Sequence, residues 1–330
     1  MTQLQTDQPI LLDVTLRDGG YVNGHSWTVH EAAAIVDAVD AAGIGFIEIG
    51  YLRHDADDPL RPSARCPEPY LTSLAPHARH AGLVVMVRPG EADPHQIAGL
   101  ADYSVRMVRV LVPGGDVQRA APYVAAARAE GLAVTTNLTR ASEASPEALA
   151  ETARRCQEIG ADLIYLADSN GSMYPDHVRA KIQAVAEATS VPAGFHAHDN
   201  LGLAFVNSCV ALEAGARALD ASLAGIGKGG GNLRLELIAG HFIVHHQAPL
   251  RLDPLARNRQ AVTAQLKMLA EGNCHALVAG LLDLNLDQAR AFQEEAARSG
   301  LDALLRTAAT RTCGEGDVLS ADARRTLAAI

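Results

Sequence analysis

The feature that most constrains the fold is a repeated alternation of short β-branched runs with Ala-rich helical stretches. Such alternation predicts strands that are each followed by a helix. Eight strands are predicted, over residues 10–16, 45–50, 83–88, 104–112, 132–138, 162–167, 191–197 and 217–223. Helices are predicted after nearly all of them, for example over residues 28–42, 116–130, 146–159, 175–189, 201–214 and 232–245.

Eight βα units that end near residue 246 match the roughly 250 residues of a TIM (β/α)8 barrel. A doubly wound open sheet is the alternative. It usually has fewer strands, and a dinucleotide-binding sheet carries G-x-G-x-x-G after its first strand, where this chain has RDGGY. The fold class is therefore α/β, with a TIM-barrel catalytic domain over residues 1–250.

After the barrel the pattern changes. Residues 254–330 contain helical stretches over 257–271 and 286–299 and a final Ala-rich segment, with little strand signal. We therefore predict a helical C-terminal region over residues 251–330. It completes the base of the barrel or forms the interface of a homo-oligomer.

Composition excludes several classes of protein. At 330 residues and 48% hydrophobic, the chain can bury a large core. No apolar stretch reaches the roughly 20 residues of a membrane span, and the segment MTQLQTDQPI lacks the regions of a signal peptide, which predicts a cytoplasmic protein. A net charge of −10 without a basic run argues against nucleic-acid binding. The five cysteines are scattered, so neither a disulfide framework nor a zinc knuckle is indicated.

The barrel prediction places functional residues at the carboxyl ends of strands, where barrel enzymes build their active sites. In this chain, unusual polar residues gather at those ends. In chain order they are Asp18, Glu48, Tyr51, Arg88, Asn137, Thr139, Asp168, Ser169, His196, His198 and the segment 228–232. We therefore expect them to meet at one mouth of the barrel.

The motif FHAHDN contains two histidines, His196 and His198, separated by one residue. Because side chains alternate along a strand, both imidazoles point to one face and Ala197 to the other. On its own, such a pair of histidines is explained as well by hydrogen bonds from the imidazoles to nearby loops. Here Asp18 in TLRDGG and Asn232 in GKGGGN follow other strands. Together the four predict a divalent-metal site, for which Mn²⁺ or Mg²⁺ is favoured and Co²⁺ or Zn²⁺ is an alternative.

Five segments carry a resemblance to a known family: TLRDGG, IEIGY, LADSNGSMYPDHV, FHAHDNLGLAFVNSCVALEAGA and DASLAGIGKGGGNLRLE. With them the chain resembles the pyruvate-aldolase and hydroxymethylglutaryl-CoA-lyase-like superfamily, the DRE-TIM metallolyases. Within that superfamily it is most similar to the 4-hydroxy-2-oxovalerate aldolases. The resemblance covers roughly residues 10–245 as a barrel.

The resemblance implies roles for individual residues. Asp18, His196 and His198 stand at the metal-binding positions of the family, and Asn232 at an asparagine that ligates the metal in some members. Arg17 stands at the arginine that steadies the enolate oxygen formed when a carbon–carbon bond breaks.

Other residues are predicted to bind substrate. Ser169 stands at a position that helps hold the keto acid in related aldolases. Glu48 and Asn137, at the ends of the second and fifth predicted strands, complete the substrate-binding set with Arg17. Arg17 also has an alternative role as the ion-pair partner of Glu48, and both roles can hold at once.

The implied activity is a metal-dependent carbon–carbon lyase that cleaves or forms a 4-hydroxy-2-oxo acid. A divalent cation chelated by the 2-oxo group and carboxylate acts as a Lewis acid on the developing pyruvate enolate. A guanidinium adds fixed positive charge at the same place. The small-molecule partners are then a 2-oxo acid and an aldehyde.

One position departs from the aldolase pattern. Where the oxovalerate aldolases carry the histidine proposed as catalytic base, this chain has Tyr21. A phenol with a pKa near 10 is a poor base unless cations perturb it. The catalytic candidates are therefore Tyr21, His25 in the following loop, or a water on the metal. Tyr21 can also serve only to orient substrate, and His25 can be an ordinary exposed loop residue.

The polar, proline-rich segment 53–69 is predicted to be a lid over the barrel mouth or plain irregular surface. Its arginines, Arg53, Arg61 and Arg65, make a carboxylated or phosphorylated substrate tail conceivable. The glycine-rich GIGKGGGN does not match a phosphate loop, because Lys228 is followed by glycine. Lys228 either contacts a distal acidic group of the substrate or is a surface lysine.

Three alternatives remain open. In related aldolases a C-terminal helical region contacts an aldehyde dehydrogenase, so such a partner is possible here, although a homo-oligomer is favoured. A Claisen-type acyl-CoA lyase or synthase of the same superfamily would require a CoA-binding groove. A non-catalytic barrel subunit would not need a complete metal site.

Overall fold

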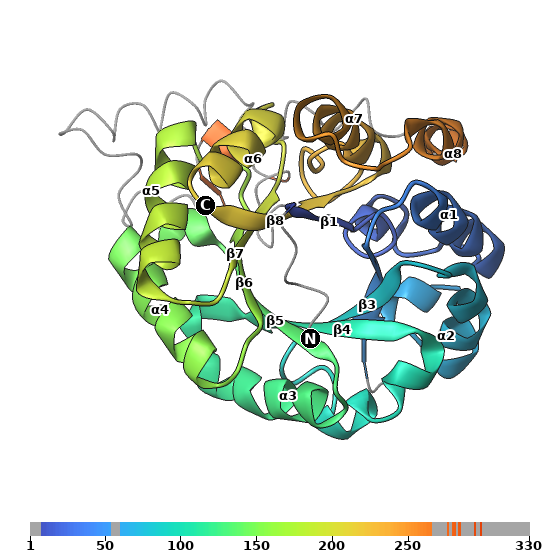
Figure 1. The fold of residues 1–330 in the computed structure, drawn as a ribbon, viewed down its shortest axis with the longest axis horizontal. Coiled ribbons are helices and arrows are strands. Elements are labelled where there is room, and N and C mark those ends of the chain that lie inside the picture. The colour runs from blue at the N-terminus through green and yellow to red at the C-terminus, as the bar shows by residue number, and fades with distance from the viewer. Residues whose placement is uncertain are drawn as a thin grey trace.

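The structure, a computed structural model, describes residues 8–53 and 60–265 and the isolated residues 276, 279–281, 283, 284, 294 and 298. Eight parallel strands form a closed barrel in chain order (Figure 1), and β1 pairs with β8 to close it. The strands are β1 Ile10–Asp13, β2 Phe46–Leu52, β3 Gly82–Val87, β4 Val105–Val112, β5 Ala133–Leu138, β6 Leu163–Asp168, β7 Ala193–Ala197 and β8 Ala216–Ala221. The predicted TIM barrel is confirmed.

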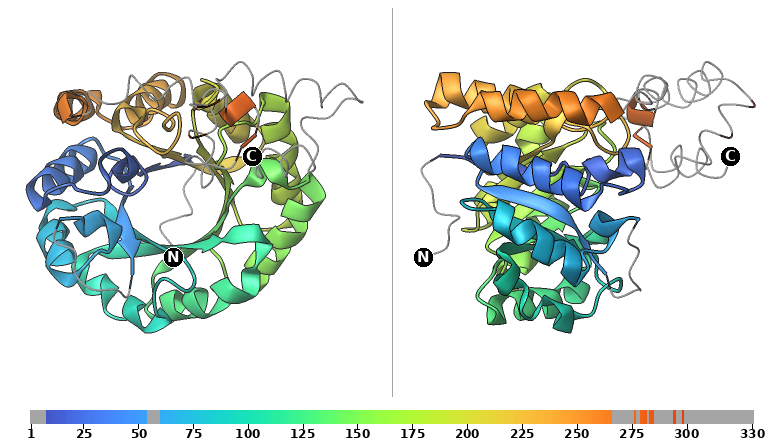
Figure 2. Two further views of the ribbon diagram at one scale, coloured as in Figure 1. Left: turned by 180° about the vertical axis from the view of Figure 1, so that it is seen from behind. Right: turned by 90° about the vertical axis from the view of Figure 1, so that its right-hand side faces the viewer.

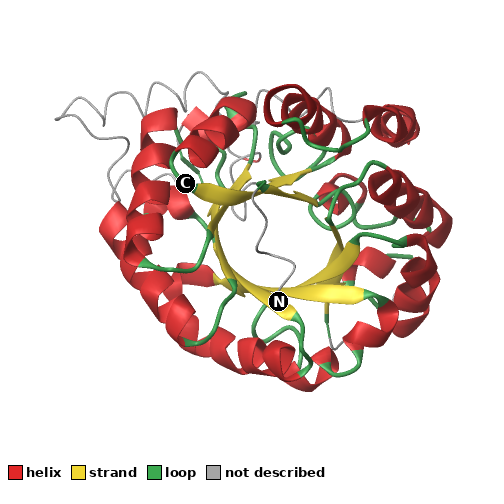
Figure 3. Cartoon of the chain, in the orientation of Figure 1, coloured by secondary structure: helices red, strands yellow, loops and turns green. Residues whose placement is uncertain are grey.

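The helices form a ring outside the sheet (Figure 3). They are α1 Val29–Ala41, α2 Glu68–Leu74, α3 Val117–Ala129, α4 Pro146–Glu158, α5 Pro175–Ala188, α6 Ala204–Glu213, α7 Leu235–His246 and α8 Leu252–Gln265. Between β3 and β4 the connection has only the 3-10 turns Pro94–Ile97 and Leu100–Tyr103. Among the described helices, none is long and apolar enough to cross a membrane.

Two expectations about local structure need correction. The segment 53–69 was predicted as loop, but α2 begins at Glu68 with Pro69 in its first turn, where the missing N–H of proline is tolerated. A helix was predicted from residue 232, but α7 begins at Leu235. Asn232 instead forms an isolated bridge with His198, and Arg234 forms one with Ser222. The chain entering α7 is therefore tied to the ends of β7 and β8.

Beyond the barrel, α8 packs beside α1 and α7, and Figure 2 shows it along the outside of the ring. Asn258 donates to the Ala34 carbonyl at 2.9 Å, and Arg259 pairs with Glu236 at 2.8 Å. The predicted helix over 257–271 corresponds to α8, and that over 286–299 lies almost wholly outside the described residues. The division at residue 250 stays a prediction.

The barrel interior is layered along the strand direction. Near the amino ends of the strands lies an apolar cluster that includes Phe46, Met107 and Ala218. Two residues further along, on the same faces of β2, β4 and β8, come the charged side chains Glu48, Arg109 and Asp220, which are almost completely buried. A second apolar cluster of Tyr51, Met86 and Leu111 lies nearer the carboxyl mouth. Charge is thus confined to one interior layer directly beneath the mouth.

Candidate metal centre and its pocket

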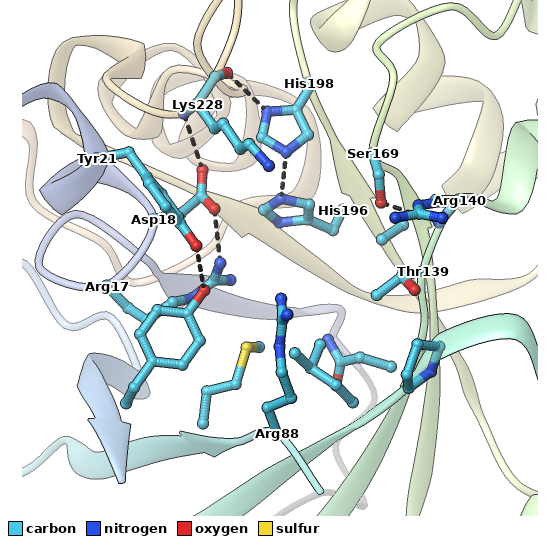
Figure 4. Close-up of a pocket in the computed structure, with 16 residues that line it drawn as sticks. Arg17, Asp18, Tyr21, Arg88, Thr139, Arg140, Ser169, His196, His198 and Lys228 are labelled. Atoms are coloured by element: carbon cyan, nitrogen blue, oxygen red, sulfur yellow. Dashed lines mark hydrogen bonds and ion pairs between the residues drawn. The ribbon is translucent and has the colours of Figure 1, made fainter. Parts of the chain in front are cut away.

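Three predicted metal ligands meet at the carboxyl mouth of the barrel (Figure 4). Asp18 follows β1, His196 lies within β7, and His198 follows it directly. One ligand atom from each lies within 4.8 Å of those of the others, and all three residues are buried. The closed sheet therefore brings together side chains that are about 180 residues apart in sequence.

Hydrogen bonds set the tautomers of both histidines. The Nδ1–H of His196 donates to Asp220 Oδ2 at 2.9 Å. The Nδ1–H of His198 donates to the carbonyl oxygens of Lys228 at 3.1 Å and Gly231 at 3.2 Å, which can only accept. Burial lowers the pKa of His198 to about 4, so its ring is neutral at physiological pH.

In the neutral form of each ring, which is the form that binds a metal, the Nε2 atom then carries a lone pair, and the two Nε2 atoms lie 3.4 Å apart. Two facing acceptors beside a carboxylate repel one another unless a cation lies between them. An imidazole whose far nitrogen donates to a carboxylate or carbonyl is the usual arrangement of a metal-bound histidine. The histidine pair thus fits a bound divalent cation.

Asn232 adds an oxygen to the same site. Its Nδ2 donates to Asp18 Oδ2 at 2.9 Å and to the Ile226 carbonyl at 3.0 Å. Its Oδ1 is buried and has no hydrogen-bond partner among the described residues. A Cβ on Gly227 would lie 2.3 Å from Nδ2, so the glycine leaves room for the amide. A buried, unpartnered oxygen is an available ligand.

Arg17 joins the ligands to the interior of the barrel. Its Nη1 pairs with Asp18 Oδ1 and its Nε with Glu48 Oε2, both at 2.6 Å. Burial favours protonation of Asp18, but Arg17 and the other polar groups around the carboxyl, among them the Asn232 amide, together outweigh it and hold its pKa well below its usual range. Asp18 is therefore a carboxylate before any metal binds.

The interior charged layer continues this connection to the second ligand. Glu48 also accepts from Arg109 Nη1 at 3.3 Å, and Arg109 Nη2 pairs with Asp220 Oδ2 at 2.6 Å. Asp220 in turn accepts from His196. Arg109 stacks over Tyr165, with its guanidinium carbon 4.2 Å from the ring centroid. A chain of alternating charge thus runs beneath the pocket from Asp18 to His196.

The metal ligands lie in a larger pocket, which Figure 4 shows in close-up. Its lining consists of Arg17, Asp18, Tyr21, Tyr51, Met86, Arg88, Leu111, Pro113, Asn137, Thr139, Arg140, Ala167, Ser169, His196, His198 and Lys228. Of the predicted substrate-binding residues, Arg17, Asn137 and Ser169 line the pocket. Glu48 does not, because it lies fully buried behind Arg17. Glu48 is instead the buried ion-pair partner of Arg17. This is the alternative role that was considered for Arg17.

The two side-chain candidates for the catalytic base are separated by the structure. Tyr21 lines the pocket, and its hydroxyl lies 3.0 Å from that of Tyr51. His25 is not among the lining residues: it is 9% exposed and packs edge-on against Tyr21, with ring centroids 4.9 Å apart. A Cβ on Gly20 would lie 2.4 Å from its Nδ1, which shows how closely the loop folds over it. His25 is therefore not an exposed loop residue, and it lies behind Tyr21 and not among the residues that line the pocket.

Sequence reasoning missed Arg109, Asp220 and Arg140. Arg109 lies within the apolar run VRMVRVLV and Asp220 within ALDA, and both are buried. A charged residue in the middle of an otherwise apolar barrel strand is a signal that would have found the first two. Arg140 lies two residues after the predicted fifth strand and lines the pocket.

A model of the HMGL-like family matches residues 8–259. Among curated proteins, the chain is 33% identical over 248 residues to "Oxaloacetate decarboxylase" of Mycobacterium tuberculosis, covering 74% of each chain. It is 36% identical over 245 residues to "4-hydroxy-2-oxovalerate aldolase" of Thermus thermophilus, covering 70% of this chain and 67% of the relative.

Solved structures share the fold. The N-terminal domain of a Bacteroides vulgatus protein is 25% identical with a TM-score of 0.79, covering 90% of this chain and 99% of that one. The HMG-CoA lyase of Brucella melitensis is 21% identical with a TM-score of 0.66, covering 79% of this chain and 99% of that one. The family predicted from the motifs is confirmed: the chain belongs to the HMGL-like family of TIM-barrel carbon–carbon lyases.

Proposed function

We propose that this protein is a divalent-metal-dependent aldolase that cleaves or forms a 4-hydroxy-2-oxo acid through the enolate of pyruvate. The observation that carries the proposal is the pair of facing imidazole lone pairs beside Asp18, with the Arg17 guanidinium at the same end of the pocket. Relatives named 4-hydroxy-2-oxovalerate aldolase support the reaction class. Relatives named as lyases disfavour the non-catalytic barrel.

Asp18, His196, His198 and Asn232 would hold the cation, which when bound supplies a Lewis acid to the 2-oxo group and carboxylate of the substrate. Two nitrogen and two oxygen donors suit Mn²⁺ or Mg²⁺. Their buried positions keep bulk water away, so the charges of the site act in a medium of low dielectric constant.

Arg17 is positioned to stabilise the enolate oxygen. Its Nε and Nη1 are held by Glu48 and Asp18, so the guanidinium plane has one orientation. Arg17 also lines the pocket, and its Nη2 remains to donate to substrate. A guanidinium fixed in advance needs no reorganisation when negative charge develops, which is the main source of electrostatic catalysis.

Substrate orientation falls to residues on other strands. Ser169 Oγ accepts from the Arg140 backbone N–H at 2.9 Å, so its own hydroxyl proton can be donated to the carboxylate of the oxo acid. On the opposite side, Tyr21 and Tyr51 form a hydroxyl pair. Burial raises the pKa of Tyr51 well above its ordinary value, so Tyr51 remains a neutral phenol. We assign the pair to orienting the 4-hydroxyl group, with Tyr21 as the member that meets substrate.

Decarboxylation of a 3-carboxylated 2-oxo acid such as oxaloacetate is the second candidate. Loss of that carboxylate yields the same pyruvate enolate but requires no base to take a proton from a 4-hydroxyl. The exclusion of His25 from the pocket lining favours this candidate, as does the relative named oxaloacetate decarboxylase.

Proton exchange of pyruvate tests the step that both candidates share. The metal-loaded protein should exchange the methyl protons of pyruvate in deuterated water, as followed by NMR, and a chelator should stop the exchange. Arg17→Lys should slow exchange by roughly 100-fold or more with little change in metal affinity, because an ammonium cannot reproduce the planar fork. Arg179→Lys, on the exposed face of α5, is the matched control.

Exchange that persists unchanged in Arg17→Lys would contradict its role, and absence of exchange with metal bound would contradict the pyruvate enolate. Production of pyruvate from 4-hydroxy-2-oxovalerate and from oxaloacetate then separates the two candidates. Release of acetaldehyde identifies the aldolase, whereas turnover of oxaloacetate alone identifies the decarboxylase.

A further inference from the structure

Two arginines line the pocket away from the metal ligands. Arg88 directly follows β3, and Arg140 lies two residues beyond the end of β5. Both contribute to the same cavity as Asp18 and the histidines, and Figure 4 shows the Arg88 side chain extending into it. The pocket is therefore cationic on the side where the second half of a substrate would lie.

The guanidinium of Arg88 contacts the protein through only one of its three nitrogen atoms among the described residues. Its contact among the described residues is an ion pair from Nε to Glu91 Oε1 at 3.4 Å, and the side chain is 46% exposed. Glu91 is shared with Arg53, which pairs with it at 2.9 Å. One carboxylate thus serves two guanidinium groups, and the two Nη atoms of Arg88 can bind a ligand.

The residues that line the pocket include more cationic than anionic side chains. Its cationic side chains are Arg17, Arg88, Arg140 and Lys228, and its one carboxylate is Asp18. Arg17 is balanced by Asp18 and by a second carboxylate behind it. Arg88 has only a shared carboxylate, Glu91, although the chain as a whole carries a formal charge of −10. Such local reversal of charge concentrates anionic ligands.

The backbone at Arg140 supports a functional placement. Its φ of 57° lies in the left-handed region, which non-glycine residues adopt at a cost of about 1 kcal/mol or more. The Arg140 N–H in that conformation donates to Ser169, the residue assigned to the oxo acid. Arg140 therefore connects the part of the pocket that holds the oxo acid with the cationic side.

We propose that Arg88, with Arg140 beside the same cavity, binds a second carboxylate of the substrate, so that the natural substrate is a 4-hydroxy-2-oxo diacid and the released aldehyde carries an acid group. The inference rests on the proposed aldolase function and specifies its substrate class. Planar guanidinium groups match carboxylates through paired hydrogen bonds. A small uncharged aldehyde such as acetaldehyde would leave the Nη atoms of Arg88 without a ligand.

The inference also separates the two candidate reactions. An arginine that holds a distal carboxylate stabilises it as an anion and so opposes its loss as carbon dioxide. Aldol cleavage leaves that carboxylate intact on the aldehyde, because the bond between C3 and C4 breaks and its electron pair stays on the pyruvate half. The proton of the 4-hydroxyl is lost as the aldehyde carbonyl forms.

Binding of unreactive analogues to the metal-loaded protein tests the inference without requiring turnover. The probes are 2-oxoadipate and 2-oxohexanoate, which have the same chain length and differ in the distal carboxylate. Calorimetry should give at least about tenfold tighter binding of the diacid, as expected for one charge-assisted contact. Arg88→Met should reduce that ratio to near one, Arg88→Lys should retain part of it, and Arg140→Met should reduce it.

Arg154→Met is the matched control, because Arg154 lies exposed on α4 and pairs with Glu151 at 3.0 Å. It should keep the wild-type ratio, and circular dichroism checks that each variant is folded. Equal affinity of the wild type for both probes would overturn the inference, as would a diacid preference that survives both Arg88→Met and Arg140→Met. Either result leaves the proposed function standing if pyruvate exchange is observed. Diacid binding without exchange would keep the distal site and reject the aldolase.

Discussion

At the residue scale, the proposed metal site depends on which nitrogen of each histidine carries the proton. Asp220 is the residue that decides this for His196, because its carboxylate accepts from Nδ1 and leaves Nε2 for the cation. It also pairs with Arg109 at 2.6 Å, which holds the carboxylate in place. Asp220 is thus a positioning residue that acts through His196, since it is fully buried behind the ring.

Replacing Asp220 tests this role. Asp220→Asn should weaken Mn²⁺ binding by about 10- to 100-fold, the usual effect of losing the carboxylate behind a ligating histidine. It should also lower the free energy of unfolding by roughly 3–5 kcal/mol, because Arg109 loses one of its two buried counter-ions. Calorimetric titration with Mn²⁺ and urea unfolding measure the two effects. Asp162→Asn, at the opposite end of the barrel, should leave the affinity unchanged, and equal affinities in both variants would contradict the role.

At the element scale, the glycine-rich connection between β8 and α7 brings Asn232 beside Asp18. Its backbone is tied to neighbouring strand ends: the N–H of Asn232 donates to the Gly225 carbonyl at 2.8 Å, and that of Asp199 to the Gly231 carbonyl at 2.9 Å. Gly231 has a φ of 96°, which strongly favours glycine. The connection therefore acts as a fixed support for the proposed ligand Asn232.

The space left by Gly227 is needed for that support. Gly227→Ala places a methyl group 2.3 Å from Asn232 Nδ2, so the amide must move away from Asp18. We expect at least about tenfold weaker Mn²⁺ binding, as for other groups that orient metal ligands. Gly240→Ala, within α7 where a Cβ meets nothing within 4 Å, is the matched control and should keep the affinity while stabilising the helix slightly. An unchanged affinity in Gly227→Ala would show that the loop has room to adjust.

At the scale of the whole molecule, closure of the barrel encloses charge that no single strand could bury. Glu48, Arg109 and Asp220 come from β2, β4 and β8 and neutralise one another in pairs. Such buried pairs add little net stability over apolar packing, but removing one partner is costly. The layer is better explained by its connection to Asp18 and His196, the proposed metal ligands, than by stability.

A separate buried carboxylate makes the stability of the whole fold depend on pH. Burial raises the pKa of Asp13 to about 7, against the opposing effect of hydrogen bonds from Thr15. Between about pH 4 and pH 7 the folded protein keeps a proton that the unfolded chain has released. The stability contribution of this group is therefore complete below about pH 4 and falls as pH rises, by up to roughly 1.4 kcal/mol per pH unit.

Asp13→Asn removes that titration. The free energy of urea unfolding, measured from pH 5 to pH 7.5, should fall less steeply with rising pH in Asp13→Asn than in the wild type. Asp102→Asn, at an exposed turn, should follow the wild-type profile. Identical slopes for Asp13→Asn and the wild type would mean that Asp13 is ionised in the folded protein throughout this range.

Much of the architecture was predictable because its signals are local. Apolar runs bounded by turn residues located the strands to within a few residues, and the H-x-H spacing placed two imidazoles on one face. Prediction was weaker where a tertiary contact overrides the local pattern. The local pattern predicts that a helix begins at residue 232. In the structure, Asn232 bridges to His198 and the helix begins at Leu235. Nothing near residue 232 in sequence signals that bridge.

By itself the sequence determined the eight βα units, and with them the end of the barrel at which Asp18, His196 and His198 lie, because strand direction and side-chain alternation follow from local chain geometry. Only the tertiary structure decided which of those residues meet. In the structure, Glu48 and His25 are not among the residues that line the pocket, and Arg109 pairs with Asp220 across 111 residues of sequence. Such contacts depend on the closure and register of the barrel, which set distances between strands that sequence separation does not encode.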